Sequence, residues 1–415
     1  MKNNKGKIKR IDVKALIVTA DCSKGNHHGY FRSPDGDDVT PFKFTNSRSG
    51  FELFWQRAEK FREVHGLGRI IFGFESTGSY SYCLATFMFK QGATVYQVNP
   101  QHTKRLKELE GNSPNKTDKK DPKVIADILM LKHGLTFLMP QGAIAELRQM
   151  ILNRERINGD INRVKNRMEA QIVLFFPEFL SVMKGLRGKS SLYLLQHHPM
   201  PWEILKLGKE RLTAIISNVS RKRLGKSRAE ALYTAAQATV GITVGLLAFR
   251  ETMSMLMQGL NLLEDQLKQI EEHIRQLVEE MPAHRILTSM KGIGLISSAT
   301  IIAEVVDFNF YHSASELLKL AGLDLYEISS GKHIGKLRIS KMGRSLLRKV
   351  LYFASLNMVK KGGIFHENYQ KYRSKGKPGP KALIAISRKL LRTIFSMVKN
   401  NVVYNSDFKK LQMAA

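Results

Sequence analysis

The sequence predicts an α/β domain at the N-terminus, followed by a helical coiled-coil region and a mainly α-helical C-terminal domain. Three observations support this fold class. Short β-prone runs alternate with amphipathic stretches first, a heptad pattern of apolar residues follows, and helical periodicity dominates the last third. Because 415 residues exceed one ordinary core, we expect three parts, covering residues 1–140, 141–282 and 283–415.

Strands and helices alternate in the first part. The β-prone runs lie at residues 15–20, 41–46, 69–74 and 94–98, the last closed by Asn99-Pro100. Helical patterns lie between them, from a candidate N-cap at Ser49 to about Gly66 and over residues 79–90. Strands and helices at this spacing predict a sheet covered by helices.

Two long helices are expected in the middle part, on either side of a helical insert over about residues 190–240. The first runs from about residue 143 to 175 and ends before Pro177. The second carries a heptad seam, made of Leu256, Leu260, Leu263, Leu267, Ile270, Ile274 and Leu277. The two helices form an antiparallel coiled coil, within or between subunits, or simply pack on a globular core.

After Pro282 the pattern is helical. The turn Gly292-Ile293-Gly294 joins two apolar helical segments, as in a helix-hairpin-helix that exposes backbone N–H groups to a phosphate, or as in a plain interhelical turn. An apolar helix over 296–306, a basic helix over 341–359 and an amphipathic helix over 382–398 complete this part.

The charge is strongly positive. Lys and Arg number 66 against 36 Asp and Glu, which gives +30 at pH 7. Such a charge favours a polyanionic partner such as nucleic acid, although a merely basic surface is the alternative. The two cysteines form no disulfide framework, and we find neither a signal peptide nor an apolar run of membrane-spanning length. We therefore expect a cytoplasmic protein that does not enter a membrane.

Four acids lie at the expected ends of strands or at a helix start: Asp21, Glu75, Asp118 and Asp121. Carboxylates at such positions converge on one edge of a sheet, and their hard oxygens suit Mg²⁺, which bridges phosphate oxygens. Each acid alone is equally explained as a cap or a solvated charge. Asp121, followed by Pro122, fits an N-cap, and the proline disfavours helical geometry at Asp121.

A serine pair, Ser329 and Ser330, precedes Gly331 in a basic loop. A serine that attacks a phosphodiester needs cations to hold the phosphate charge, and the loop offers Lys332, Lys336, Arg338 and Lys341. The alternative is a polar turn before a helix. The pairs His27-His28 and His197-His198 lack partner ligands at suitable spacing, and we expect them at the surface.

Seven motifs in this order resemble those of the insertion-sequence one-ten transposases, relatives of the Piv invertases. The resemblance covers nearly the whole chain, and its motifs are Asp21 to Lys24, Gly73 to Gly78, Lys116 to Asp121, Gly292 to Gly294, Ala321 to Leu323, Ser329 to Gly331 and Ile339 to Gly343. This chain departs from the family pattern at Ala20, where a large aliphatic residue is usual, and at Pro122, where alanine is common.

The resemblance implies a RuvC-like, ribonuclease-H-type domain first, with an Asp-Glu-Asp-Asp set that binds Mg²⁺. The matching residues are Asp21, Glu75, Asp118 and Asp121. It also implies a C-terminal transposase domain whose serine forms a covalent link to DNA, here Ser330, with Ser329 in reserve. A coiled coil that assembles subunits and a non-coding bridge RNA that pairs with donor and target DNA are further implications.

The leading interpretation is thus a DNA transposase that works as a homo-oligomer with DNA and bridge RNA. A hydrolytic RuvC-like junction nuclease and a non-catalytic nucleic-acid-binding protein are the alternatives. Besides the loop cations and the Gly292–Gly294 turn, the candidate nucleic-acid surface consists of Arg148, Arg154, Arg163, Arg167, Arg221, Lys222 and Arg223.

Overall fold

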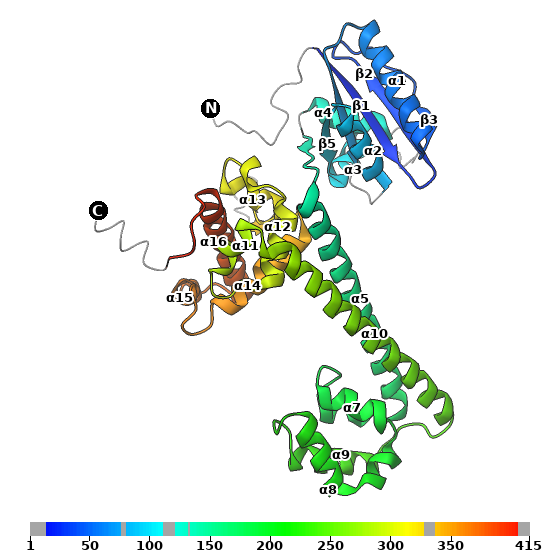
Figure 1. Cartoon of the computed structure of the whole chain (residues 1–415), viewed down its shortest axis with the longest axis vertical. Coiled ribbons are helices and arrows are strands. Elements are labelled where there is room, and N and C mark those ends of the chain that lie inside the picture. Colours follow the sequence, from blue (N-terminus) through cyan, green and yellow to red (C-terminus); the bar gives the residue numbers. More distant parts are fainter. Residues whose placement is uncertain (1–13, 76–79, 111–120, 132, 328–336, 406–415) are drawn as a thin grey trace, which may run out of the picture. The chain divides into compact units, whose positions relative to one another are not determined.

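The computed structural model describes residues 14–75, 80–110, 121–131, 133–327 and 337–405 (Figure 1). These residues divide into two compact units. The first consists of Met1–Gln141, Val305–Ser355 and Glu367–Val402, and the second of Gly142–Glu304, Leu356–His366 and Val403–Ala415, in each case as far as they are described. The predicted site residues Asp118, Ser329, Ser330, Lys332 and Lys336 lie outside the described residues.

A mixed six-stranded sheet forms the N-terminal domain of the first unit. Its order is β3-β2-β1-β4-β5-β6. The central strand β1 pairs antiparallel with β2 and parallel with β4, while β5 continues the parallel part. The bounds are β1 Ala15–Cys22, β2 Asn26–Arg32, β3 Phe42–Thr45, β4 Arg69–Glu75, β5 Thr94–Val98 and β6 Leu135–Thr136. The four expected strands are therefore present, and β2 and β6 were not predicted.

The strand β2 escapes sequence reasoning because Asn26, His28 and Arg32 interrupt its apolar pattern and Gly29 resembles a breaker. The glycine has a packing reason. A Cβ at this position would lie 2.4 Å from the ring of Phe54. The expectation that His27 lies at the surface is wrong, since its side chain is fully buried between Phe44 and Phe51.

Helices cover both faces of the sheet. On one face, α1 (Arg48–Val64) and α2 (Tyr80–Lys90) enclose a core that includes Leu16, Val18, Phe54 and Phe72. On the other face, α4 (Asp121–Met130) packs on Ile17, Tyr30, Ile71 and Val98. The strand residues thus alternate between two cores, as a sheet buried on both sides requires.

Two boundaries differ from the sequence prediction. Helix α1 is capped by Ser47, whose Oγ accepts from the backbone N–H of Gly50 at 3.2 Å, so the expected cap Ser49 lies within the first turn. A further helix, α3 (Pro100–Glu110), follows β5 directly. The sequence predicts only the end of a strand at this point, because Asn99-Pro100 resembles a turn. Asn99 instead accepts from the backbone N–H of Gln101 at 2.9 Å.

In the second unit, the long helices α5 (Gly142–Phe175) and α10 (Leu246–Glu279) lie side by side (Figure 1). The ion pairs Arg154–Glu271 and Lys165–Glu264 show that the helices run antiparallel, because one residue number rises as the other falls. Seam residues of α10, among them Leu256, Leu260, Leu263 and Leu267, belong to the same core as residues of α5. The seam is therefore largely covered within the chain.

The remaining elements are short. The insert between the long helices consists of α6 (Pro177–Met183), α7 (Lys189–His197), α8 (Pro201–Val219) and α9 (Lys226–Gln237). The second unit continues with α11 (Pro282–Thr288) and α12 (Leu295–Val305). The C-terminal part of the chain carries α13 (Ala314–Leu320), the hairpin β7 (Leu325–Tyr326) and β8 (Arg338–Ile339), α14 (Ser345–Met358), α15 (His366–Ser374) and α16 (Gly379–Lys399). Within the described part of the chain, no helix is long and apolar enough to cross a membrane.

Candidate active site

Asp21 and Glu75 lie at the ends of neighbouring parallel strands. The registered pairs of β1 and β4 end at Ala20 and Phe74, so the two acids follow at the next position of each strand. They share the sheet face of Ile17 and Ile71, the face that α4 covers, because side chains alternate along a strand. The backbone thus places two of the four predicted acids at one edge of the sheet.

Asp121 reaches the same edge as the first residue of α4. The buried hydroxyl of Thr19 donates to the carbonyl oxygen of Pro122 at 2.6 Å, which fixes the start of α4 over β1. Further along, Gly73 allows α4 to approach β4, since a Cβ there would lie 2.4 Å from Leu129. The departure from the family pattern at Pro122 therefore coincides with a buried residue that is hydrogen-bonded to the sheet.

Helix α3 contributes two residues that sequence reasoning missed. Lys107 Nζ lies 2.5 Å from Asp121 Oδ1. Thr103, one turn earlier on the same face, is almost fully buried, and its side chain hydrogen-bonds Glu75. The only signal in the sequence was a polar residue four positions before a lysine, which is too common to be informative.

The electrostatics tie these groups together. Burial raises the pKa of Glu75 above its ordinary value, and the negative charges of Asp21 and Asp121 raise it further, while Thr103 and Lys107 oppose the rise. Burial, and then the charge of Asp21, raise the pKa of the adjacent Cys22 thiol to about 12, so this cysteine stays protonated at neutral pH. The site is thus an anionic, partly desolvated cluster.

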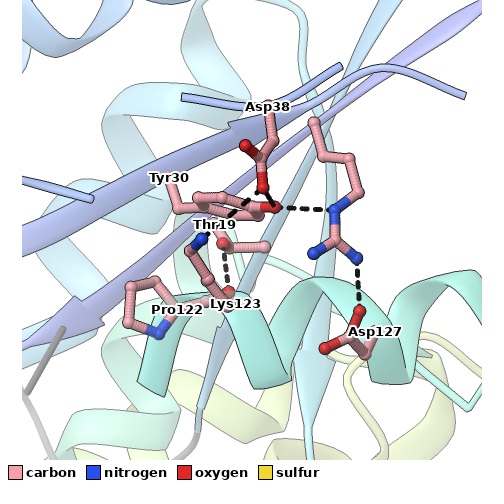
Figure 2. Close-up of polar contacts among 7 residues, drawn as sticks. Thr19, Tyr30, Asp38, Pro122, Lys123 and Asp127 are labelled. Atoms are coloured by element: carbon pink, nitrogen blue, oxygen red, sulfur yellow. Dashed lines mark hydrogen bonds and ion pairs between the residues drawn. The ribbon is translucent and has the colours of Figure 1, made fainter. Parts of the chain in front are cut away.

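A polar network holds α4 against β2 beside this cluster (Figure 2). The Tyr30 hydroxyl donates to Asp38 at 2.5 Å and accepts from Arg32 Nε at 2.6 Å. Arg32 continues to Asp127 on α4, and Lys123, also on α4, lies 3.6 Å from Asp38. The helix that carries Asp121 is therefore tied to the sheet by charges at two of its turns.

The described acids suit a hard divalent cation in chemistry, since they offer carboxylate oxygens next to a glutamate whose ionisation a metal would favour. Among the residues that the structure describes, no group of three Asp, Glu, His or Cys side chains is close enough to form a complete metal site. The fourth predicted ligand, Asp118, lies outside them. Lys107 contacts Asp121, and its charge also acts on Glu75.

The segments on either side of the predicted serine loop form a clasp, which we define as residues 319–326 and 338–348. The hairpin pairs Leu325 with Ile339 and Tyr326 with Arg338. Three backbone hydrogen bonds extend it: Ser340 N to Asp324 O at 2.9 Å, Lys341 N to Gly322 O at 3.0 Å and Arg344 N to Leu320 O at 2.7 Å. The two ends of the serine loop are therefore brought next to each other.

Glycines make the clasp tight. A Cβ at Gly343 would lie 2.4 Å from both Gly322 N and Leu320 O, and Gly322 itself has φ +62°. Arg348 Nη1 donates to the carbonyl oxygen of Ala321 at 2.8 Å. The motifs Ala321 to Leu323 and Ile339 to Gly343, separate in sequence, thus meet in the clasp. Of the predicted loop cations, Arg338 lies on β8 and Lys341 has φ +55° at the turn that follows.

The predicted basic surface of the second unit is divided. Arg148 donates to the carbonyl oxygen of Ala303 and forms a mostly buried ion pair with Glu304 at 3.2 Å, and Arg154 is held by Glu271 at 2.7 Å. These two arginines serve internal contacts. Exposed basic residues remain at Arg163, which pairs with Asp160, at Arg167, and at the turn formed by Arg221, Lys222 and Arg223.

Two other features bear on the predicted contacts with a phosphate. The turn with Gly292 (φ +115°) and Gly294 joins α11 to α12, as a helix-hairpin-helix or a plain turn would. Sequence reasoning missed Arg388 on α16, whose buried Nε has no hydrogen-bond partner among the residues that the structure describes. Burial and the nearby Arg392 lower the pKa of Arg388, while Asp324 of the clasp opposes the shift. An anion would satisfy this group.

Comparison with known proteins gives matches over most of the chain. A family model described as a transposase, of the IS110 DEDD type, matches residues 18–177, and one described as the transposase IS116/IS110/IS902 family matches residues 284–370. The insertion element IS110 43.6 kDa protein of Streptomyces coelicolor is 24% identical over 94% of this chain and 96% of its own length. The insertion element IS116 44.8 kDa protein of Streptomyces clavuligerus is 22% identical over the same shares.

Proposed function

The chain belongs to the IS110 family of transposases, and we propose that it cuts and rejoins the DNA strands of an insertion sequence through a carboxylate site and a serine nucleophile. The observation that carries this proposal is the position of Asp21, Glu75 and Asp121 at one sheet edge. The negative charges of both aspartates act on Glu75 and raise its pKa. Carboxylates gathered at one place, where they can bind divalent metal, are typical of phosphoryl-transfer sites.

The sheet supports a ribonuclease-H-type, RuvC-like assignment of the N-terminal domain. An antiparallel β1–β2–β3 meander followed by the parallel strands β4 and β5, with acids at the ends of β1 and β4, is compatible with that fold. Asp21, Glu75, Asp118 and Asp121 would hold Mg²⁺, which when bound neutralises phosphate charge. Thr103 hydrogen-bonds Glu75 and orients it for this task.

For the serine, the proposed step is attack of the Ser330 hydroxyl oxygen on a phosphorus atom of DNA. A serine–phosphate ester forms, the bond to one deoxyribose oxygen breaks, and that oxygen takes up a proton. The hydroxyl proton passes to a general base, a role that we assign to a carboxylate of the acidic site. The clasp supports this assignment because it fixes both ends of the loop and places Arg338 and Lys341 beside it.

The partners are proposed on charge and family membership. A charge of +30 supports binding of DNA and of a bridge RNA that pairs with donor and target. Assembly as a homo-oligomer, with α5 and α10 as a coiled coil, also stays a proposal. Because the α10 seam packs against α5 of the same chain, burial of the seam does not require a second subunit.

The test uses a suicide DNA substrate that traps protein–DNA adducts. Ser330→Ala should bind DNA and form no adduct, whereas Glu75→Gln should lose cleavage in Mg²⁺ while remaining folded. Adduct formation by Ser330→Ala but not by Ser329→Ala would move the nucleophile by one residue. If neither serine is needed and the product carries free ends, the hydrolytic nuclease interpretation holds instead.

A further inference from the structure

Lys107 is the cation that the structure places among the proposed metal ligands. Its ammonium nitrogen lies 2.5 Å from a carboxylate oxygen of Asp121, and both side chains are partly buried, with exposed fractions of 30% and 19%. It is also close enough to Glu75 to favour the charged form of that carboxylate. One cation from α3 therefore serves acids from β4 and α4.

The position of Lys107 is fixed by the fold. Asn99 follows β5 directly, and its side chain accepts from the backbone N–H of Gln101 at the start of α3. Thr103 is 1% exposed and hydrogen-bonded to Glu75. It lies one turn before Lys107 on the same face of α3, and so it fixes this part of the helix. Lys104, three positions earlier, shows the contrast, because its side chain is 80% exposed and lies 4.0 Å from Glu108.

Asp21, Glu75 and Asp121 offer three carboxylates, and the ammonium of Lys107 contacts one of them, Asp121. The Oδ1 atom of Asp121, which contacts the ammonium at 2.5 Å, cannot also coordinate a cation from the same side, so a metal ion that takes this oxygen competes with Lys107 for it.

We infer that Lys107 is a built-in counter-ion of the acidic site, which holds Asp121 in the metal-free protein and is displaced when a divalent cation binds. This inference rests on the proposed carboxylate site and adds a positioning residue to it. Lys107 keeps the acids from repelling one another before metal arrives, and it lowers the affinity for metal because the two cations compete for Asp121.

The test compares Lys107→Met with the matched control Lys104→Met in the full-length chain. In EDTA, Lys107→Met should lower the melting temperature, because the acids lose their counter-ion, while Lys104→Met should not. Mn²⁺, titrated calorimetrically, should bind Lys107→Met about tenfold more tightly than wild type, the change expected for removing one charged hydrogen bond. Glu75→Gln should weaken Mn²⁺ binding in either background.

A double-mutant cycle in EDTA completes the test. Asp121→Asn should cancel most of the destabilisation caused by Lys107→Met, because the two residues lose the same interaction. If Lys107→Met binds Mn²⁺ no more tightly than wild type while Glu75→Gln still weakens binding, the metal site stands and the displacement is refuted. If wild type binds no Mn²⁺, the proposed metal site is wrong. If the cycle shows no coupling between Lys107 and Asp121, the proposed counter-ion role of Lys107 is wrong as well.

Discussion

Replacing Gly343 by alanine should open the clasp. The added Cβ would lie 2.4 Å from two backbone atoms, Gly322 N and Leu320 O, where ordinary contacts are about 3.4 Å or more. The two strands of backbone must therefore separate by about 1 Å. The hydrogen bonds Arg344 N to Leu320 O and Lys341 N to Gly322 O, now 2.7 and 3.0 Å, would be lost or badly stretched.

Two stretched backbone hydrogen bonds and a forced shift should together cost about 2–4 kcal/mol of unfolding free energy. Urea denaturation followed by circular dichroism measures this loss. The control is Gly259→Ala on α10, where an added Cβ meets nothing within 4 Å and should stabilise by up to about 1 kcal/mol. On the suicide substrate, Gly343→Ala should also form less adduct. Stability equal to that of wild type would refute the close approach from which the cost is derived.

Three further changes test other parts of the structure. Thr19→Val keeps the side-chain shape but leaves the buried Pro122 carbonyl without its donor. The change should lower the free energy of unfolding by about 1–3 kcal/mol, measured by urea denaturation, and should weaken Mn²⁺ binding. Unchanged values would contradict the role of this hydrogen bond in fixing the start of α4. Burial lowers the pKa of His27, so at falling pH the unfolded chain is protonated at His27 before the folded chain is. Stability should therefore fall as pH drops below about 6.5. The melting temperature of His27→Leu should fall less over this pH range than that of wild type. Arg388→Gln should reduce the slope of log DNA affinity against log salt concentration by about one unit. The control Arg48→Gln, at an exposed ion pair, should leave this slope nearly unchanged. Equal slopes for Arg388→Gln and wild type would argue against a phosphate contact.

Sequence reasoning succeeded where one local pattern decides the structure. The strands β1, β4 and β5 are short β-prone runs between clear breakers, and α5 and α10 have long helical periodicity. The acids at the ends of β1 and β4 followed from these strands. The chain also belongs to the family whose motifs it was expected to share.

Sequence reasoning failed where tertiary contacts override local conformational preference. Gly29 and His27 made β2 look like a loop, although Gly29 is needed for the approach of Phe54 and His27 is enclosed by aromatic rings. Lys107 could not be recognised as a site residue from the sequence, because its contact partner Asp121 lies on a different helix, α4. Likewise, the exposure of Arg148 could not be read from its helix alone, since its partner Glu304 lies 156 residues later.

The clasp makes the serine loop exchangeable in principle. Because Tyr326 and Arg338 are paired neighbours, the two points at which the segment between them begins and ends are fixed relative to each other. Lengthening a loop between fixed ends costs little free energy, since closure entropy grows only logarithmically with length. Variation in this segment among transposons should therefore be tolerated without rebuilding the frame. A laboratory could graft the corresponding segment of a relative between these two residues as a single cassette.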